Sequence, residues 1–393
     1  MDKTLRRRGR DGMNVLVIPG YYSDGQDPTK GIFIREQIQA CKDIHQIRVL
    51  FPQTFISGQE EFHFIKQNED NVVTYRTYLK ILGNPAKSNH YYTLNAVLSY
   101  ELILKDGFKP HIIHAHLSYP SGIAAQILSR RFKIPYIITE HSRPGLIMRT
   151  PLRKALIPEA VKQASCVIAI SNLLKEELVS ANLAGNYKVL PNVVNHDVFY
   201  PGEKKVNYNN SINAVIVANM RTDHIKGLKY LFEALSLIKD KLNNFKLYII
   251  GDGETKDYYA EMSKRLGVFG FCEFHGYKKK TEIADLMRES DFFIMSSDYE
   301  TGGCVLLEAM ACGLPVISTR VGYARDEVNE QLGIVVDPKD SGSLAQGILQ
   351  MLTTFHLYNR DEIRKASEKY SYNAYCREMD KIYRQVVMER GTS

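Results

Sequence analysis

The sequence predicts an α/β protein of two domains, each with a parallel β-sheet that is covered by helices on both faces. Its length of 393 residues corresponds to about two domains at roughly 100–200 residues each. Short apolar runs that suit buried strands alternate with longer helical patterns along the whole chain. The alternation breaks once, over residues 185–212, which are rich in Asn, Gly and Pro. We therefore place the domain boundary in this segment.

The first half is expected to form one sheet with its helices. Each expected strand is an apolar run that leads into a glycine or a polar turn, and each expected helix has apolar residues three or four apart. In order, these elements are strand 14–19, helix 31–44, strand 111–116, helix 121–132, strands 135–141 and 166–171, and helix 172–181.

The second half repeats the pattern and ends differently. Its expected elements are strand 213–220, helix 227–238, strands 246–253 and 271–276, helical residues 284–287, strand 292–297, helix 305–313 and strand 315–320. Residues 370–390 have helical spacing and follow no new strand. The predicted domains are 1–197, with 1–12 as a basic tail, and 198–370; residues 371–393 form a C-terminal helix that returns to the first domain.

The composition excludes several protein classes. Hydrophobic residues make up 44% and charged residues 24%, which is ordinary for a globular protein and excludes wholesale disorder. The six cysteines are scattered without a C-x-x-C pair, which indicates neither a disulfide framework nor a zinc knuckle. No apolar run approaches the roughly 18 residues of a membrane-spanning helix. We therefore expect a cytoplasmic protein.

The net charge of +7 is unevenly distributed. Residues 1–197 hold 25 Lys and Arg against 17 Asp and Glu, whereas the remaining residues hold 26 against 27. A solvated basic face would explain the excess, and so would attraction to a phosphate-bearing acceptor or an anionic membrane surface. Residues 144–157, in which basic and apolar residues are interleaved, are the candidate for membrane contact, although their apolar side chains could equally pack into a core. Nucleic-acid binding is not expected, because no basic stripe interleaved with aromatic residues occurs.

The most informative motif lies between the strand at 292–297 and the helix at 305–313. It places Glu300, Gly302 and Gly303 in a loop, and Glu308 early in the helix. Glycines let a ligand approach the backbone, and the free amides of a helix start can bind a phosphate. The alternative is a helix that has acidic residues near its N-terminus for dipole reasons alone.

Two further loops carry candidate residues of the second half. Arg221 and Lys226 lie between a strand and a helix, where two cations could hold a pyrophosphate or simply be solvated. Gly251 and Gly253 begin a dinucleotide fingerprint, but Lys256 occupies its third glycine position, so a nicotinamide site is not expected.

Histidines cluster at the ends of two expected strands in the first half. His114 and His116 alternate onto one face of the strand at 111–116, and Glu140 and His141 end the strand at 135–141. A His-x-His pair lacks a third metal ligand, so no metal is expected. One histidine hydrogen-bonding a polar substrate, or a structural role for each, are the two readings left open.

Together these motifs resemble the family-four retaining glycosyltransferases of GT-B fold, the glycosyl transferases group 1. The stretch from Glu300 to Glu308 with its continuation AMACGLPVIST resembles that family's signature of two glutamates eight apart. Arg221 and Lys226-Gly227 match its arginine and lysine-glycine pair. The stretches PGYYSDGQDPTKGIF, HAHLSYPSG, ITEHS, PNVVNHDVF and IIGDG resemble further family motifs in the same order.

The resemblance implies two Rossmann-like domains facing across a cleft, and a retaining, metal-independent hexosyltransferase without a cofactor. The implied donor is a nucleotide-diphosphate sugar. The charge asymmetry of the chain points to a glycan or lipid-linked acceptor in cell-surface polysaccharide or glycolipid synthesis. The lipid-linked acceptor would bring the enzyme to the inner face of the cytoplasmic membrane. The implied site is His116 and Glu300 as catalytic residues, Arg221, Lys226, Gly302 and Gly303 on the diphosphate, Glu308 on the ribose, and Gly31, His141 and Cys304 near the donor sugar or phosphate.

The chain departs from the family pattern in two places. Thr301-Gly302-Gly303 replaces the commoner Gly-Phe-Gly, and Asn192-Val193 stands where Asn-Gly is usual. Because a fold does not dictate a function, two alternatives remain open: a nucleotide-sugar epimerase or hydrolase of the same fold, and a catalytically silent glycan-binding protein.

Overall fold

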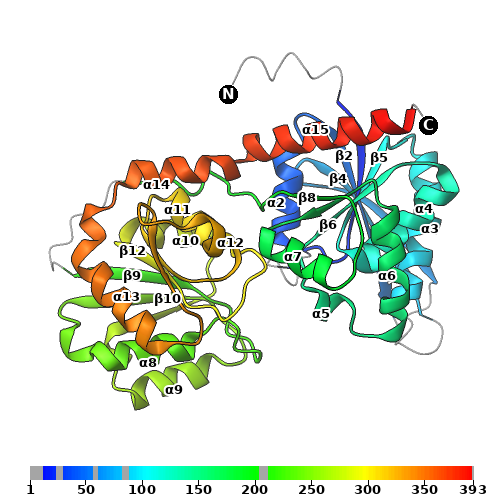
Figure 1. The fold of residues 1–393 in the computed structure, drawn as a ribbon. Helices are drawn as coiled ribbons and strands as arrows, with labels where there is room; N and C mark the ends of the chain where they lie inside the picture. Colours follow the sequence, from blue (N-terminus) through cyan, green and yellow to red (C-terminus); the bar gives the residue numbers. More distant parts are fainter. Residues whose placement is uncertain (1–11, 24–29, 56–60, 82–87, 203–210, 392–393) are drawn as a thin grey trace. The chain divides into compact units, whose positions relative to one another are not determined.

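The computed structural model describes residues 12–23, 30–55, 61–81, 88–202 and 211–391, and the basic residues 1–11 lie outside them. The chain divides into two compact units (Figure 1). Unit 1 is residues 1–193 together with 372–393, and unit 2 is residues 194–371. Each unit has its own β-sheet with helices, so the predicted fold class of two α/β domains is confirmed.

Unit 1 is built on an eight-stranded sheet in the order β3-β4-β2-β1-β5-β6-β7-β8. The strands are β1 Asn14–Pro19, β2 Gln46–Phe55, β3 Phe62–Glu69, β4 Val72–Lys80, β5 Ile112–His116, β6 Tyr136–Glu140, β7 Cys166–Ala169 and β8 Tyr187–Val189. Strand β3 pairs antiparallel with β4, whereas the other neighbours pair parallel.

Helices cover this sheet and enclose two apolar cores. They are α2 Ile32–Cys41, α3 Ser88–Lys105, the π-helical turn Ser118–Gly122, α4 Ile123–Phe132, α5 Pro144–Ile147, α6 Pro151–Gln163, α7 Asn172–Ser180 and α15 Tyr372–Gly391. Helix α15 lies beside α2 (Figure 1) and buries Met379 and Tyr383 in the core that also contains Val17 and Ile38. The expected return of the last helix to the first domain is confirmed.

Two parts of unit 1 were not predicted from the sequence. Strands β2, β3 and β4 occupy a segment where no strand was expected, and β8 lies inside the segment interpreted as the interdomain linker. The β3–β4 hairpin turns at Asp70 and Asn71, which both have positive φ, as a two-residue type I′ turn requires. An Asp-Asn pair between two β-rich runs is a weaker signal than Asn-Gly, and the three residues of β8 are too few to show a period.

Unit 2 has a six-stranded, all-parallel sheet in the order β11-β10-β9-β12-β13-β14. The strands are β9 Ile212–Val217, β10 Phe245–Ile250, β11 Cys272–Gly276, β12 Phe292–Met295, β13 Val316–Thr319 and β14 Gly333–Val336. The helices are α8 Leu228–Ile238, α9 Lys256–Arg265, α10 Lys280–Glu289, α11 Cys304–Ala311, α12 Gly322–Glu327, α13 Ser341–Thr354 and α14 Arg360–Ser367. Two apolar cores lie on its faces.

Both sheets reverse their strand order at one point. In unit 1 the chain places β2 on one side of β1 and β5 on the other, and in unit 2 it places β10 and β12 on opposite sides of β9. Loops that leave the carboxyl ends of such strands diverge and leave room for a ligand. These two switch points are where the candidate site residues lie.

Candidate functional site

In unit 2, the loops after β9 and β12 are joined by an ion pair. Lys226 Nζ lies 2.6 Å from Glu300 Oε1, and the Ser297 hydroxyl donates to the same oxygen at 2.8 Å. Both charged side chains are largely buried, with exposed fractions of 25% and 13%. The sequence predicted Lys226 and Glu300 for one site, and the structure brings them into contact.

Gly227 explains how these two loops come so close. It ends the β9 loop with a φ of 64°, and a Cβ at this position would lie 1.9 Å from the Ser296 carbonyl oxygen. No other residue fits such a contact with backbone. The Asp298 amide donates to the Ile225 carbonyl at 2.8 Å, and the Ser296 hydroxyl donates to the Lys226 carbonyl at 2.9 Å. These two hydrogen bonds fix the backbone that carries the Lys226 side chain.

A second ion pair lies on α11. Glu308, whose side chain is 5% exposed, lies 2.7 Å from the ammonium of Lys280, the first residue of α10. The sequence predicted Glu308 as a site residue but gave Lys280 no partner. A lysine run at the start of a helix is by itself an ordinary solvated feature, so no sequence signal could have found this pair.

The loop between Glu300 and α11 contains the stretch Thr301-Gly302-Gly303, which departs from the usual family pattern at its first two residues. Gly303 has a φ of 91°, which favours glycine, and immediately precedes Cys304, the first residue of α11. The Gly302 carbonyl accepts from the Tyr323 amide at 2.7 Å. The start of α11 therefore lies in the same loop as Glu300, as the motif predicted.

Arg221 stands apart from these contacts. It is exposed in the β9 loop, and its guanidinium makes no hydrogen bond or ion pair with any residue that the structure describes. Its backbone carbonyl accepts from the His224 amide at 3.1 Å. The structure therefore does not join Arg221 to Lys226, although both follow the same strand.

In unit 1, three histidine rings are stacked at the carboxyl ends of β5 and β6. The His114 and His116 ring centroids are 4.3 Å apart, and those of His116 and His141 are 5.4 Å apart. All three side chains are at most 5% exposed. The predicted placement of His114 and His116 on one face of the strand is confirmed.

Burial keeps these imidazoles neutral. It lowers the pKa of His114 and His141 to about 3, and lowers the pKa of His116 well below its ordinary value, with the neighbouring histidines adding to the effect. His114 is held by hydrogen bonds of 2.7 Å to the Tyr383 hydroxyl and to Thr139 Oγ1. Neither partner was predicted from the sequence.

Glu140 anchors the turn that carries His141. Its carboxylate accepts from the Ser118 amide and hydroxyl at 2.8 and 2.6 Å, and from the amides of His141 and Ser142 at 2.9 and 2.8 Å. Burial raises the pKa of Glu140, whereas these four donors favour its charged form. The sequence placed Glu140 beside His141 without giving it this role.

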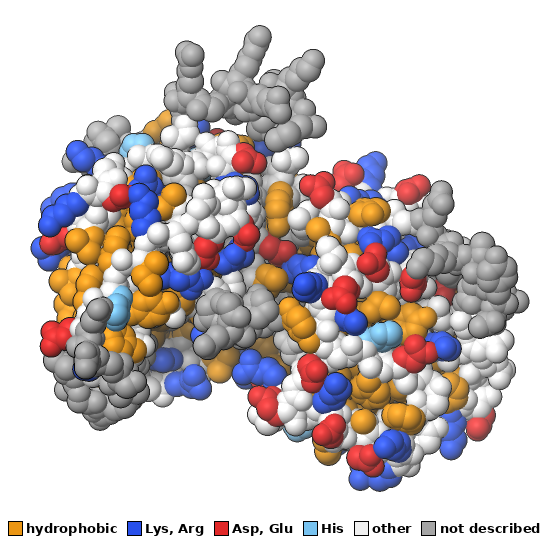
Figure 2. All heavy atoms as spheres, turned by 180° about the vertical axis from the view of Figure 1, so that it is seen from behind, with side chains coloured by type: hydrophobic (Ala, Val, Ile, Leu, Met, Phe, Trp, Pro, Cys, Tyr) orange, Lys and Arg blue, Asp and Glu red, His pale blue; other side chains and the backbone are white. Residues whose placement is uncertain are grey.

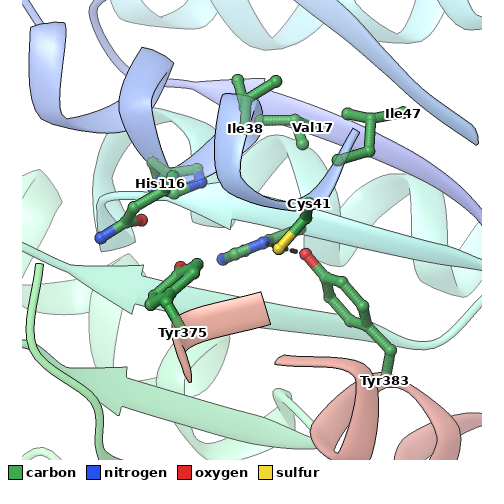
Figure 3. Close-up of a pocket in the computed structure, with 9 residues that line it drawn as sticks. Val17, Ile38, Cys41, Ile47, His116, Tyr375 and Tyr383 are labelled. Carbon is green, nitrogen blue, oxygen red and sulfur yellow. Dashed lines mark hydrogen bonds between the residues drawn. The ribbon is translucent and has the colours of Figure 1, made fainter. Parts of the chain in front are cut away.

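A small cavity lies behind the histidines, with room for about one water molecule. Figure 3 shows Val17, Ile38 and Ile47 on one side of it and Tyr375 and Tyr383 of α15 on the other. The cavity is too small for a sugar nucleotide. It marks the place where α15 packs behind the histidine strand.

Gly31 begins α2 with a φ of 68°, where a Cβ would lie 2.7 Å from the Tyr21 carbonyl oxygen. The loop that leads to it, predicted as a glycine-bearing family motif, lies partly outside the described residues, at 24–29. Within the described part of the chain, no group of His, Cys, Asp and Glu could hold a metal ion, and no helix is long and apolar enough to cross a membrane.

Two family models match this chain. Residues 34–198 match the model of Glycosyltransferase Family 4, and residues 203–375 match that of Glycosyl transferases group 1. An uncharacterised glycosyltransferase of Methanocaldococcus jannaschii is 29% identical over 347 residues, 82% of this chain and 87% of that protein. N-acetyl-alpha-D-glucosaminyl L-malate synthase of Bacillus anthracis is 27% identical over 296 residues, 71% of this chain and 75% of that protein.

A solved structure shares the fold. The Anabaena protein HepE in complex with UDP superposes with a TM-score of 0.72 at 17% identity, covering 95% of this chain and all of HepE. At this identity the likeness shows the GT-B fold alone.

Proposed function

This chain belongs to the family-four, group 1 glycosyltransferases, and from that premise we propose that it transfers a sugar, with retention of configuration, from a nucleotide-diphosphate donor to a glycan or lipid-linked acceptor. The product belongs to cell-surface polysaccharide or glycolipid synthesis. The observation that carries the proposal is the pair of lysine–glutamate contacts in unit 2, Lys226–Glu300 and Lys280–Glu308.

The nucleotide part of the donor binds to unit 2 in this proposal. Glu308 accepts hydrogen bonds from the ribose hydroxyls, and Lys226 and the exposed Arg221 bind the diphosphate. Backbone amides at Gly303 and the start of α11 add donors, as helix starts do for phosphates. The negative charge that develops on the leaving diphosphate is stabilised by these groups, in place of a metal ion.

Glu300 contacts the hydroxyls of the donor sugar. Its carboxylate is already fixed by Lys226 and Ser297, so it is poised to orient a hydroxyl and poorly suited to attack the anomeric carbon. Retaining hydrolases use a carboxylate nucleophile. Because Glu300 is held in this way, we assign retention to attack by the acceptor hydroxyl on the face from which the diphosphate leaves. The leaving phosphate takes the proton of that hydroxyl.

Unit 1 contributes His116 to the donor sugar. The ring is neutral and fixed between two other histidines, so it acts as a hydrogen-bonding group of fixed orientation. Gly31 and His141 belong to the surroundings of the sugar or phosphate in unit 1, and Cys304 to those in unit 2.

The acceptor side of the proposal involves a membrane surface. In residues 144–157, Ile147 and Ile157 are buried in the core, whereas Leu146 and Leu152 are 43% and 41% exposed beside the exposed Arg149 and Lys154. Leu94, Leu98 and Ile127 on α3 and α4 are exposed as well. Figure 2 shows hydrophobic side chains gathered near Lys and Arg on unit 1, the left-hand body in that view. Such a surface suits an anionic bilayer that presents a lipid-linked acceptor.

The test begins with calorimetry of the purified protein against UDP, GDP, ADP and their sugars. The nucleotide that binds is then supplied as its sugar with membrane extract as acceptor source, and the anomeric configuration of the product is read by NMR. A product with the donor's configuration, formed in EDTA, is expected. Inverted products, or sugar released equally with and without acceptor, would contradict the proposal and favour another reaction on the same fold.

A further inference from the structure

His116 and His141 share a hydrogen bond whose proton can belong to either imidazole ring. His116 Nδ1 and His141 Nε2 are 3.1 Å apart, and the two rings are nearly parallel at 15°. A neutral imidazole carries one proton, on one of its two nitrogens. Exactly two arrangements of a neutral pair therefore make this hydrogen bond: His116 donates from Nδ1, or His141 donates from Nε2.

The surroundings of His141 distinguish the two arrangements. Its other nitrogen, Nδ1, is buried and has no hydrogen-bond partner among the described residues. The apolar Phe33 ring also packs against this imidazole, with ring centroids 4.5 Å apart. Whichever form Nδ1 takes, the described residues offer it neither a donor nor an acceptor.

If His116 donates, the proton of His141 must be on Nδ1, and a buried N–H is left without an acceptor. If His141 donates from Nε2, the unpaired Nδ1 is a lone pair instead. Orphaned buried N–H groups are rarer in native proteins than acceptors with an unused lone pair. The second arrangement is therefore the more stable one.

The turn around His141 is rigid enough to maintain this choice. Glu140 accepts from the backbone amide of His141 at 2.9 Å and from that of Ser118 at 2.8 Å, which ties the ends of β5 and β6 together. On its other side, His116 stacks on His114 at 26° between the ring planes. Neither neighbouring ring leaves His116 free to rotate about its side-chain bonds.

We propose that His141 is a positioning residue, which holds His116 in the tautomer protonated at Nε2 so that His116 meets its substrate as a hydrogen-bond donor and not as a base. The inference deepens the proposed function and rests on it for the identity of the substrate, a nucleotide-diphosphate sugar. Among the described residues, His116 Nε2 has no hydrogen-bond partner of its own. An N–H at that position can donate to a sugar hydroxyl or to a phosphate oxygen. Negative charge builds up on the phosphate oxygen as the glycosidic bond breaks.

The tautomer is tested directly by long-range ¹H–¹⁵N correlation NMR of the ¹⁵N-histidine-labelled protein, with His116→Gln used to assign its signals. A protonated Nε2 and an unprotonated Nδ1 on His116 are expected at pH 7. The opposite pattern would overturn the inference, whether or not the enzyme is active.

A pair of variants tests the role in catalysis. In His141→Gln the side-chain amide nitrogen can reach the place of Nε2 and donate to His116, whereas in His141→Asn, one methylene shorter, it cannot. We expect His141→Gln to retain most of the activity and His141→Asn to lose about 10- to 100-fold in kcat, as is usual when an orienting partner is lost, with little change in KM for the donor. Equal activity of the two variants would overturn the positioning role.

These outcomes are separable from the fate of the proposed function. An Nε2-protonated His116 in a protein that transfers no sugar would support the tautomer and contradict the proposed function. An active transferase with an Nδ1-protonated His116 would support the function and overturn this inference.

Discussion

The two switch points of the molecule differ in the charge of the side chains that lie there. In unit 2, Lys226 in the loop after β9 pairs with Glu300 in the loop after β12, and Lys280 of α10 pairs with Glu308 of α11. In unit 1, the residues at the ends of β5 and β6 are imidazoles that burial keeps neutral, and they are stacked on one another. The unit 2 site offers two ion pairs together with the exposed Arg221, whereas the unit 1 site offers uncharged hydrogen-bonding groups.

This difference matches the two parts of a nucleotide sugar. A diphosphate carries negative charge and is bound by cations. In the free protein, a carboxylate pairs with such a cation in place of the diphosphate. A sugar is uncharged and is oriented by hydrogen bonds from groups of fixed geometry. The two units should therefore respond differently to pH and to substitution.

The largest expected difference concerns stability in acid. His114, His116 and His141 have a lowered pKa in the folded protein, so below a pH of about 6.5 the unfolded chain binds protons that the folded chain does not. Stability then falls as the pH falls, by about 1.4 kcal/mol per pH unit for each neutral histidine, or about 4 kcal/mol for the three. The raised pKa of Glu140 acts in the opposite direction, but it is a single group.

Hydrogen exchange followed by mass spectrometry at pH 7 and pH 5.5 tests this difference. After correction for the intrinsic exchange rates, peptides from β5 and β6 should lose protection, whereas peptides from β9 and β12 serve as the internal control. Equal loss in both sheets would show that the histidine cluster does not determine the acid sensitivity of unit 1.

The next largest effect is expected for Lys226→Met. Removing a cation that binds the leaving diphosphate should lower kcat/KM by about 100- to 1000-fold, the range seen when one group that stabilises developing charge is removed. Calorimetry should also show weaker binding of the nucleotide diphosphate. Lys229→Met, on the exposed face of α8 where its nearest partner is Glu233 at 3.9 Å, is the matched control and should be close to wild type.

His116→Ala should separate turnover from nucleotide binding. We expect kcat to fall by about 10- to 100-fold, as for the loss of a positioned hydrogen-bonding group, while the affinity for the nucleotide diphosphate stays unchanged. His111→Ala is the control, because that ring is exposed at the other end of the same strand and accepts from the Asn14 amide. A matching loss of nucleotide affinity would show that the two sites do not divide the donor in this way.

Glu308 and Lys280 should behave as one unit. Glu308→Gln removes the carboxylate proposed to bind the ribose, and we expect about a tenfold weaker affinity for the nucleotide, consistent with losing a charged hydrogen bond. Adding Lys280→Met to that variant should cost little more, because the lysine has lost its partner. Independent, additive losses in the double variant would show that Lys280 contacts the nucleotide by itself.

The sequence predicted the positions of these residues better than their contacts. Strand alternation placed His114 and His116 on one face, and the glutamate spacing placed Glu308 early in its helix. The ion pair of Glu308 with Lys280 joins α11 to α10, and the hydrogen bond of His114 with Tyr383 joins β5 to α15. Such contacts depend on how helices pack on the sheet, which a local pattern does not encode.

In the segment 144–157, the sequence pattern did not determine which apolar side chains are buried. Its apolar residues could be assigned from the sequence to a core or to a membrane surface, and the structure divides them between the core and the exterior. Ile147 and Ile157 are buried, whereas Leu146 and Leu152 remain exposed. The pattern has no clean helical period because a short helix, α5, ends within it before α6 begins.

The smallest expected effect lies on this surface and concerns single charges. Arg149→Ser and Lys154→Ser should each weaken binding to anionic vesicles by about fivefold, which corresponds to roughly 1 kcal/mol for one basic residue near the bilayer. Arg153 is a poorer choice, because its guanidinium packs on the Tyr119 ring at 4.5 Å and is partly buried. The matched control is Lys105→Ser, which removes the same charge from an exposed position at the end of α3. Sedimentation with vesicles of neutral and of mixed anionic lipid at two salt concentrations measures the binding. If all three variants lose affinity equally, the attraction comes from the net charge of unit 1 and not from a defined surface, and the acceptor must then be sought without reference to the membrane.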